Sequence, residues 1–191
     1  MTFGEWELLA KQGIAEAEYN LGLIFSRGKE VPRDDKKAVK WYRLAAEQGL
    51  AQSQTNLGLM FGKGQGIEQN YKEAVKWYRL AAEQGLAQSQ TNLGLMFGKG
   101  QGVEQDYKEA VKWYRLAAEQ GLAQAQHNLG VMFGKGQGVE QDYIEAHKWF
   151  NIAGVNGNEI GCRNADIVEK KMTPGQIAVA VGLKRKWLEK C

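Results

Sequence analysis

The sequence is poor in the residues that build metal sites and disulfide frameworks. Its 191 residues include only two cysteines, two histidines and two prolines. Cys162 and Cys191 do not form a Cys-x-x-Cys pattern, and His127 and His147 offer very few ligands for a metal. The sequence therefore predicts no metal site and no cofactor.

Long apolar runs and a strong charge of either sign are also missing. No run approaches the roughly 20 apolar residues that a helix needs to cross a bilayer. The segment after Met1 is amphipathic and charged, unlike the apolar core of a secretory signal. As written, the chain is expected in the cytoplasm, or in the periplasm or outside the cell if a signal was removed. A net charge of +3 is too small to indicate a nucleic-acid partner.

What the sequence does contain is an internal repeat. Residues 50–85 and 86–121 follow one another and differ at only two positions, Ile67/Val103 and Asn70/Asp106. A fixed period of this length indicates stacked helical units, because each unit covers the apolar face of its neighbour. We therefore divide the chain into a truncated cap (1–13), four repeats (14–49, 50–85, 86–121, 122–157) and a degenerate repeat with a C-terminal capping helix (158–191).

Each unit contains two helical patterns, as residues 50–85 illustrate. The first helix is expected from about Ala51 to Lys63, where a glycine ends it. The second begins at Asn70, a good N-cap residue, and its wide apolar face must be covered on two sides. Gly58 is expected to let the helices approach closely. The tryptophans that recur every 36 residues are predicted to lie in the core rather than to form a stacking platform: Trp41, Trp77, Trp113 and Trp149.

The repeated motif A-x-x-Q-x-N-L-G-x-M-F-x-x-G, followed by G-[IV]-x-Q-[ND]-Y-x-x-A-x-x-W-Y-x-x-A-A-x-x-G, resembles the Sel-one-like repeat (SLR) family. These repeats are close relatives of tetratricopeptide (TPR) repeats, and the resemblance covers about residues 14–157. It implies an all-α fold, a right-handed α/α superhelical solenoid of antiparallel helix pairs, whose first helices line the concave side. It also implies a scaffold or adaptor that binds other proteins.

TPR-like geometry places three rows of first-helix residues toward the concave side. The rows are Tyr19/Thr55/Thr91/His127, Leu23/Leu59/Leu95/Val131 and Arg27/Lys63/Lys99/Lys135. We predict a groove with an apolar floor and a basic margin. Other interpretations stay open: the cations also suit a helix C-terminus, the leucines also suit repeat packing, and His127 also suits an ordinary surface position. The lysine and asparagine of the TPR carboxylate clamp are absent, since Thr55 and Leu59 stand there.

Catalysis is not expected, because no nucleophile and base converge in the sequence. His147 replaces a valine of the second-helix apolar face and is interpreted as a packing residue. The leading hypothesis is a non-catalytic module that binds an extended or helical protein segment with apolar and acidic residues. The alternative is a regulatory or assembly subunit, with a cell-envelope role, that docks through its ends or convex face. Its candidate patch is Arg163, Lys170, Lys171 and 184–186. A cell-wall hydrolase is disfavoured, and the oligomeric state is not predicted.

The C-terminal segment is expected to form a hairpin of helices 158–171 and 174–190. Thr173, Pro174 and Gln176 form a helix-start signal, and Ile177, Val181 and Leu188 are expected to face inward. In such a hairpin Cys191 would lie about 12 Å beyond the residue opposite Cys162, which is too far for a disulfide. Both cysteines are therefore predicted to be free.

Overall fold

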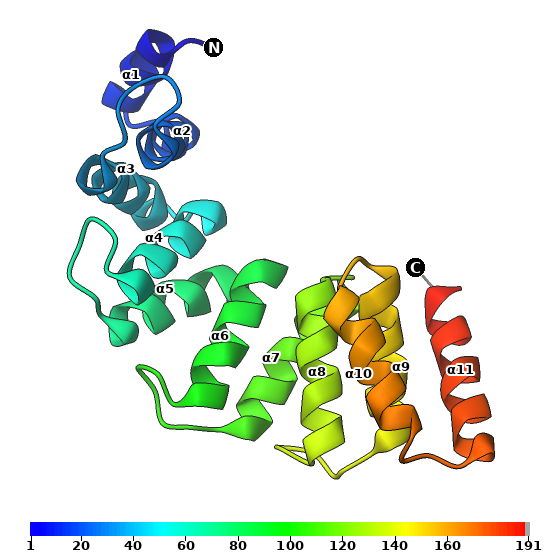
Figure 1. The fold of residues 1–191 in the computed structure, drawn as a ribbon. Helices are drawn as coiled ribbons and strands as arrows, with labels where there is room; N and C mark the ends of the chain where they lie inside the picture. The colour runs from blue at the N-terminus through cyan, green and yellow to red at the C-terminus, as the bar shows by residue number, and fades with distance from the viewer. Residues whose placement is uncertain (190–191) are drawn as a thin grey trace. The chain divides into compact units, whose positions relative to one another are not determined.

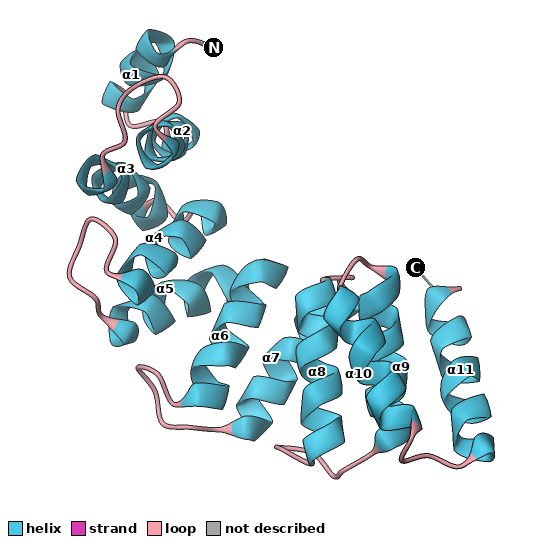
Figure 2. Ribbon diagram, viewed as in Figure 1, coloured by secondary structure: helices cyan, strands magenta, loops and turns pink. Residues whose placement is uncertain are grey.

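The computed structural model describes residues 1–189, which form eleven helices and no strand (Figure 2). The helices are α1 (Phe3–Lys11), α2 (Ala15–Arg27), α3 (Asp35–Glu47), α4 (Ala51–Lys63), α5 (Tyr71–Glu83), α6 (Ala87–Lys99), α7 (Tyr107–Glu119), α8 (Ala123–Lys135), α9 (Tyr143–Val155), α10 (Glu159–Glu169) and α11 (Pro174–Leu188). None of these helices is both long and apolar enough to cross a membrane.

The chain packs as two compact units. Unit 1 comprises residues 1–89 and 101–104, and unit 2 comprises residues 90–100 and 105–191. Within unit 1 the successive helices from α1 to α5 pack against one another in chain order, and within unit 2 the successive helices from α7 to α10 do so (Figure 1). Helix α11 contacts α9. Consecutive helix pairs with a 36-residue spacing confirm the predicted all-α solenoid fold.

The second helices begin at the predicted caps. The side chain of Asn70 accepts a hydrogen bond from the backbone N–H of Glu73 at 3.1 Å, and Asp106 and Asp142 cap α7 and α9 in the same way. A glutamate stands three residues after each of these caps, at Glu73, Glu109 and Glu145. Glu145 accepts hydrogen bonds from Lys148 and Trp149 within its own helix.

Glycine in the first helix allows the close approach that the sequence predicted. A Cβ atom built on Gly58 would lie 2.8 Å from the ring of Tyr78, and one on Gly130 would lie 2.7 Å from the ring of Phe150. Real Cβ atoms do not tolerate such distances, so the aromatic ring of each second helix occupies the volume that a side chain would need. Gly22 and Gly94 repeat this arrangement against Tyr42 and Tyr114.

The tryptophans lie in the core, as predicted. Trp77, Trp113 and Trp149 are buried and Trp41 is half-buried. Trp149 donates its indole N–H to Glu145 at 3.1 Å, whereas the indole nitrogens of Trp77 and Trp113 are buried without a hydrogen-bond partner among the described residues. The burial of Trp77, Trp113 and Trp149 leaves no row of exposed rings for stacking bases or sugars.

The C-terminal helix departs from the prediction. Helix α11 packs against α9, with the rings of Trp149 and Trp187 5.9 Å apart, instead of pairing with α10. Its buried residue is Ala180, and of the expected inward stripe only Ile177 is partly buried. The prediction is wrong for Val181 and Leu188, which are exposed. The hairpin from which the cysteine separation was estimated is thus not formed.

The two cysteines have to be considered separately. Cys162 is exposed and forms no disulfide with a described residue. Cys191 lies outside the described residues, so the absence of a disulfide stays a prediction.

Candidate functional site

The three rows predicted to line the groove differ in exposure. Thr55 and Thr91 are only 8% and 4% exposed. The hydroxyl of Thr55 lies 2.6 Å from that of Ser89 and donates to the carbonyl of Ala51 at 2.8 Å. Thr55 therefore joins two repeats, Thr91 is buried at the equivalent position, and in this row only Tyr19 and His127 retain part of their surface.

The apolar and basic rows are more accessible. Leu59 and Leu95 are each 37% exposed, which is unusual for leucines that recur at a fixed repeat position. Leu23 and Val131 are half-buried. All four cations of the last row are exposed: Arg27, Lys63, Lys99 and Lys135.

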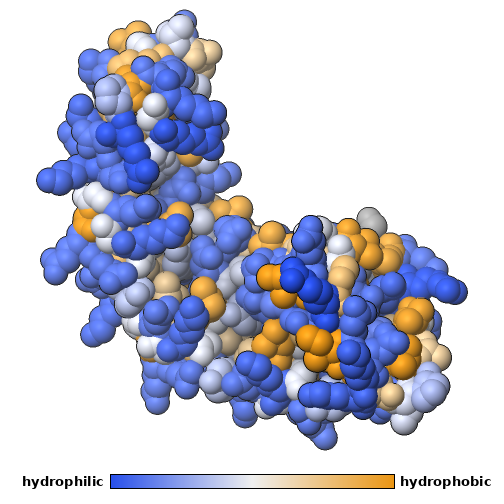
Figure 3. Space-filling model, viewed as in Figure 1, coloured by the Kyte–Doolittle hydropathy of each residue, from blue (hydrophilic) through white to orange (hydrophobic). Residues whose placement is uncertain are grey.

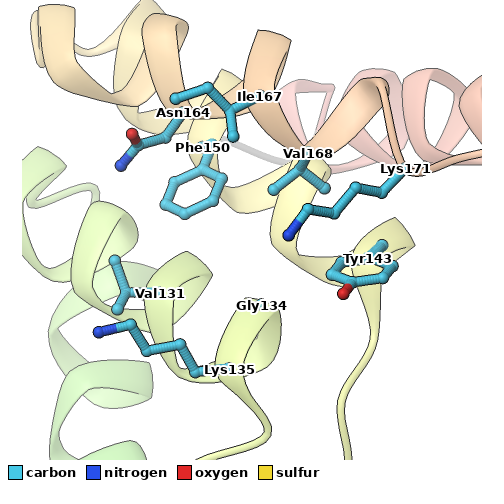
Figure 4. Close-up of a pocket in the computed structure, with 9 residues that line it drawn as sticks. All are labelled: Val131, Gly134, Lys135, Tyr143, Phe150, Asn164, Ile167, Val168 and Lys171. Carbon is cyan, nitrogen blue, oxygen red and sulfur yellow. The ribbon is translucent and has the colours of Figure 1, made fainter.

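A pocket opens beside this row in unit 2, between the successive first helices α8 and α10 (Figure 4). We call it the α8–α10 pocket. Its volume is about 180 Å³. It is lined by Val131, Gly134 and Lys135 of α8, Tyr143 and Phe150 of α9, and Asn164, Ile167, Val168 and Lys171 from α10 and the residues after it.

The α8–α10 pocket combines an apolar interior with two cations. Phe150 packs on Gly130, and Ile167 is 54% exposed although it is apolar. Lys135, the last residue of α8, and Lys171, which follows α10, both line the pocket, and the Lys171 ammonium points toward Tyr143 (Figure 4). Neither lysine forms an ion pair with a described residue, and the Lys171 ammonium lies 5.4 Å from the centre of the Tyr143 ring. Figure 3 shows further apolar surface over α8, α10 and α11.

His127 lies at the edge of this pocket. Its Nε2 is 2.9 Å from the amide nitrogen of Asn164, and its ring centre is 5.5 Å from that of Phe150. Because Asn164 donates to an imidazole nitrogen, the two side chains hold each other in place on the pocket rim. His127 therefore acts as a support for the rim and is more than an isolated surface residue.

Unit 1 holds a pocket at equivalent positions, three repeats earlier in the chain. This α2–α4 pocket has a volume of about 220 Å³. It is lined by Leu23, Ser26, Arg33, Asp35, Tyr42, Asn56, Leu59, Met60 and Gln65. Seven of these residues occupy repeat positions that also line the α8–α10 pocket. The repeat thus builds the same recess in both units.

The α2–α4 pocket is more polar. The hydroxyls of Tyr42 and Ser26 lie 3.1 Å apart, and burial raises the pKa of Tyr42. Asp35 stands where the other pocket has Tyr143, and the Arg33 guanidinium donates to it through two nitrogens, at 2.9 and 2.8 Å. The charge in this pocket is therefore neutralised within the chain.

Sequence reasoning missed two repeat positions of the site, one held by an asparagine and one by Lys171. Asn56 and Asn164 line the pockets, and an asparagine recurs at this position in every repeat, but the sequence analysis quoted it only as part of a motif. Lys171 was assigned to a terminal basic patch, whereas it lies 36 residues after Lys135 and extends the basic row. The 36-residue spacing was the signal for both.

The described residues show no cluster of three potential metal ligands. His147 is buried, as the sequence predicted, and its Nε2 lies 3.3 Å from a carboxylate oxygen of Glu169. This contact joins the end of α10 to α9. It serves packing and forms no recess with a nucleophile.

The comparisons with known proteins agree on one family. The Sel1 repeat family model matches residues 15–50, 51–86, 87–122 and 123–158. The Sel1 repeat protein from Oxalobacter formigenes is 33% identical, with a TM-score of 0.83 over 98% of this chain and 74% of its own. A protective antigen of uropathogenic Escherichia coli strains with an SLR fold is 34% identical, with a TM-score of 0.64 over 97% of this chain and 48% of its own.

A more distant structure shares the fold alone. Helicobacter pylori cysteine rich protein B is 24% identical, with a TM-score of 0.55 over 71% of this chain and 97% of its own. No curated protein matches the chain.

Proposed function

Because the chain belongs to the Sel1 repeat family, whose members are generally protein-interaction scaffolds, we propose that it binds a partner protein along its first helices. The observation that supports this proposal is the α8–α10 pocket, whose apolar interior and unpaired lysines stay open to solvent. Exposed apolar surface with a polar rim is typical of interaction sites. The fold is typically non-catalytic, and we propose no reaction for it.

The residues of the proposed site come from the predicted rows, with the corrections above. They are Tyr19, Leu23, Arg27, Leu59 and Lys63 in unit 1, and Leu95, Lys99, His127, Val131, Lys135 and Lys171 in unit 2. The partner would be an extended or helical protein segment with apolar and acidic residues. Many small contacts along a preformed surface give affinity with little cost of reorganisation.

A second candidate surface lies on the second helices. Leu44, Leu80 and Leu116 recur at one repeat position and are 36%, 39% and 40% exposed. This row supports the alternative of docking through the predicted convex face. The two surfaces carry leucines of almost equal exposure, so they can be compared directly.

The experiment is a selection of peptides from a random display library on the whole chain, followed by affinity measurements on two variants. Leu95→Glu places a carboxylate on a first helix, and Leu116→Glu places one on a second helix, both at positions of similar exposure. We expect Leu95→Glu to weaken the binding of the selected peptides about tenfold or more, because the loss of one buried contact site lowers the affinity by at least that factor.

Leu116→Glu is the matched control and should leave the affinity within about twofold. The opposite ranking would move the site to the second helices. A selection that enriches no peptide sensitive to either variant would reject the proposal. Circular dichroism of both variants checks that the helices are intact.

A further inference from the structure

We infer that the α8–α10 pocket binds one aliphatic side chain of an extended acidic segment, with the pattern acid-x-aliphatic-x-acid, in a partner protein. This inference rests on the proposed function and specifies the partner for one pocket. The two flanking acidic side chains would pair with Lys135 and Lys171.

The size of the pocket limits its occupant. Sites for metabolites and cofactors usually enclose roughly 300–1,000 Å³, whereas this pocket holds about 180 Å³. It is therefore suited to a single side chain. Val131, Phe150, Ile167 and Val168 supply apolar surface, so an aliphatic side chain gains from leaving water.

The charge of the pocket indicates which residues should flank the aliphatic residue in the partner segment. Lys135 is the last residue of α8, and Lys171 follows the end of α10 at the equivalent repeat position. The described residues provide no carboxylate for either ammonium within ion-pair distance. In the equivalent α2–α4 pocket the lining carboxylate of Asp35 is paired with Arg33, and Arg27 and Lys63, which stand at the positions of Lys135 and Lys171, are not among the lining residues. No carboxylate lines the α8–α10 pocket beside its two lysines. A partner can therefore supply the missing negative charge.

The spacing follows from the geometry of an extended chain. Alternate residues of such a chain point to the same side and lie about 7 Å apart. Packed helices lie about 8–10 Å apart, and α8 and α10 are in contact. In a segment that crosses from α8 to α10 with its aliphatic residue in the pocket, residues i−2 and i+2 lie about 14 Å apart, outside the two helix axes. The long side chains of the two lysines would have to extend outward along the segment to reach them.

The exposed positions of the site allow substitutions that spare the core, and these substitutions are tested for their effect on binding of a designed peptide.

The probe is a fluorescently labelled peptide, capped at both ends, with the sequence Glu-Ser-Leu-Ser-Glu between serine and glycine spacers. Its binding to the whole chain is measured by fluorescence anisotropy at low ionic strength. Three further peptides carry glutamine in place of both glutamates, serine in place of leucine, or a free carboxylate on a C-terminal leucine without glutamates.

Each protein variant has a matched control. The double variant Lys135→Glu/Lys171→Glu is compared with Lys72→Glu/Lys108→Glu, which makes the same charge change at exposed lysines of the second helices α5 and α7, outside the proposed site. Ile167→Ser is compared with Ile160→Ser, because both isoleucines lie on α10 and both are 54% exposed. Only Ile167 lines the pocket.

We expect the lysine double variant to weaken binding of the probe about tenfold or more and to reduce the salt dependence of that binding. The control at Lys72 and Lys108 should change the affinity by less than about twofold. Ile167→Ser should weaken binding of the probe, whereas Ile160→Ser should leave it unchanged. The glutamine and serine peptides should bind more weakly than the probe.

Three results would overturn the inference. They are equal binding of the glutamine peptide, binding that only the C-terminal leucine peptide shows, and equal effects of the two double variants. If any of these occurs while Leu95→Glu still weakens library-selected peptides, the proposed function stands and only the assignment of this pocket fails. If Leu95→Glu also has no effect, both fail.

Discussion

The α2–α4 and α8–α10 pockets occupy equivalent repeat positions but differ in chemistry. In unit 1, Asp35 is paired with Arg33, and the Tyr42 hydroxyl bonds to Ser26. In unit 2, Tyr143 and Phe150 stand at the positions of Asp35 and Tyr42, and the lysines have no anionic partner among the described residues. The repeat backbone therefore sets where a recess forms, while a few side chains decide what it can bind.

The largest effect is expected where the two pockets are alike, at the glycine beneath each aromatic ring. Gly130→Ala should lower the free energy of unfolding by about 1–3 kcal/mol, because its Cβ would lie 2.7 Å from the Phe150 ring. Gly134→Ala is the control, since its Cβ would meet that of Ala146 at an ordinary 3.7 Å. This control should be neutral or stabilising by up to about 1 kcal/mol. Urea unfolding monitored by circular dichroism measures both, and equal losses would contradict the packing account.

Next in size is a buried carboxylate found only in unit 1. Glu18 is 3% exposed, and burial raises the pKa of its carboxyl above the ordinary value, although Gln48 donates to it at 2.7 Å. The equivalent Gln126 of unit 2 donates to the carbonyl of Ala118 and accepts from Asn156. Glu18→Gln should therefore stabilise the protein at pH 7 by about 1 kcal/mol.

The pH dependence gives this prediction a second check. A carboxyl with a raised pKa in the folded state destabilises the protein above that pKa, and the penalty disappears below the pKa of the unfolded chain. The gain in melting temperature of Glu18→Gln should therefore shrink as the pH falls from 7 toward 4. A gain that is constant with pH would contradict the role of the buried charge.

A smaller effect is expected from the hydroxyl that distinguishes the floors of the two pockets. Tyr42→Phe reproduces the residue type of Phe150 and removes the bond to Ser26, which should cost about 0.5–1 kcal/mol. Tyr78→Phe is the control, because the Tyr78 hydroxyl forms no hydrogen bond with a described residue. Thermal melts of the two variants should separate by a few degrees, with Tyr42→Phe lower. Equal melting temperatures would show that the bond contributes nothing.

The smallest effect concerns the ion pair of unit 1. Arg33→Gln removes an exposed pair worth about 0.2–1 kcal/mol. The equivalent Gln141 donates to the carbonyl of Gly134 at 2.9 Å, so the new glutamine can bond to the carbonyl of Ser26 instead. The net change should stay within about 0.5 kcal/mol. A larger loss in a thermal melt would mean that the pair supports the loop after α2.

Much of the fold could be predicted because four sequence repeats encode the same helix pair. The spacing of glycine, alanine and tryptophan located every helix pair, and the close approach at Gly58 followed from residue size alone. The last helix could not be predicted in this way, because α11 has no second copy. Its packing on α9 depends on the contact between Trp149 and Trp187, which are distant in sequence.

The candidate site was predicted less completely than the fold. The basic row is exposed and the apolar row is exposed or half-buried, but Thr55 and Thr91 are buried, and the Thr55 hydroxyl bonds to the next repeat. The asparagine that lines the pockets follows directly after this position in the chain. Patterns with a period near 3.6 residues define a face only within a residue or so. Which of two adjacent side chains points into a recess is decided by tertiary packing.

The most direct test is to observe which residues a bound segment touches. Nuclear Overhauser effects between the leucine methyl protons of the bound acidic peptide and side-chain protons of the protein report packed contacts, in which heavy atoms lie within about 4.0–4.5 Å of each other. The account predicts signals to Phe150 and Val131 that are lost in Ile167→Ser. Signals to Trp113 or Leu116 on the second helices, with none to Phe150, would contradict it.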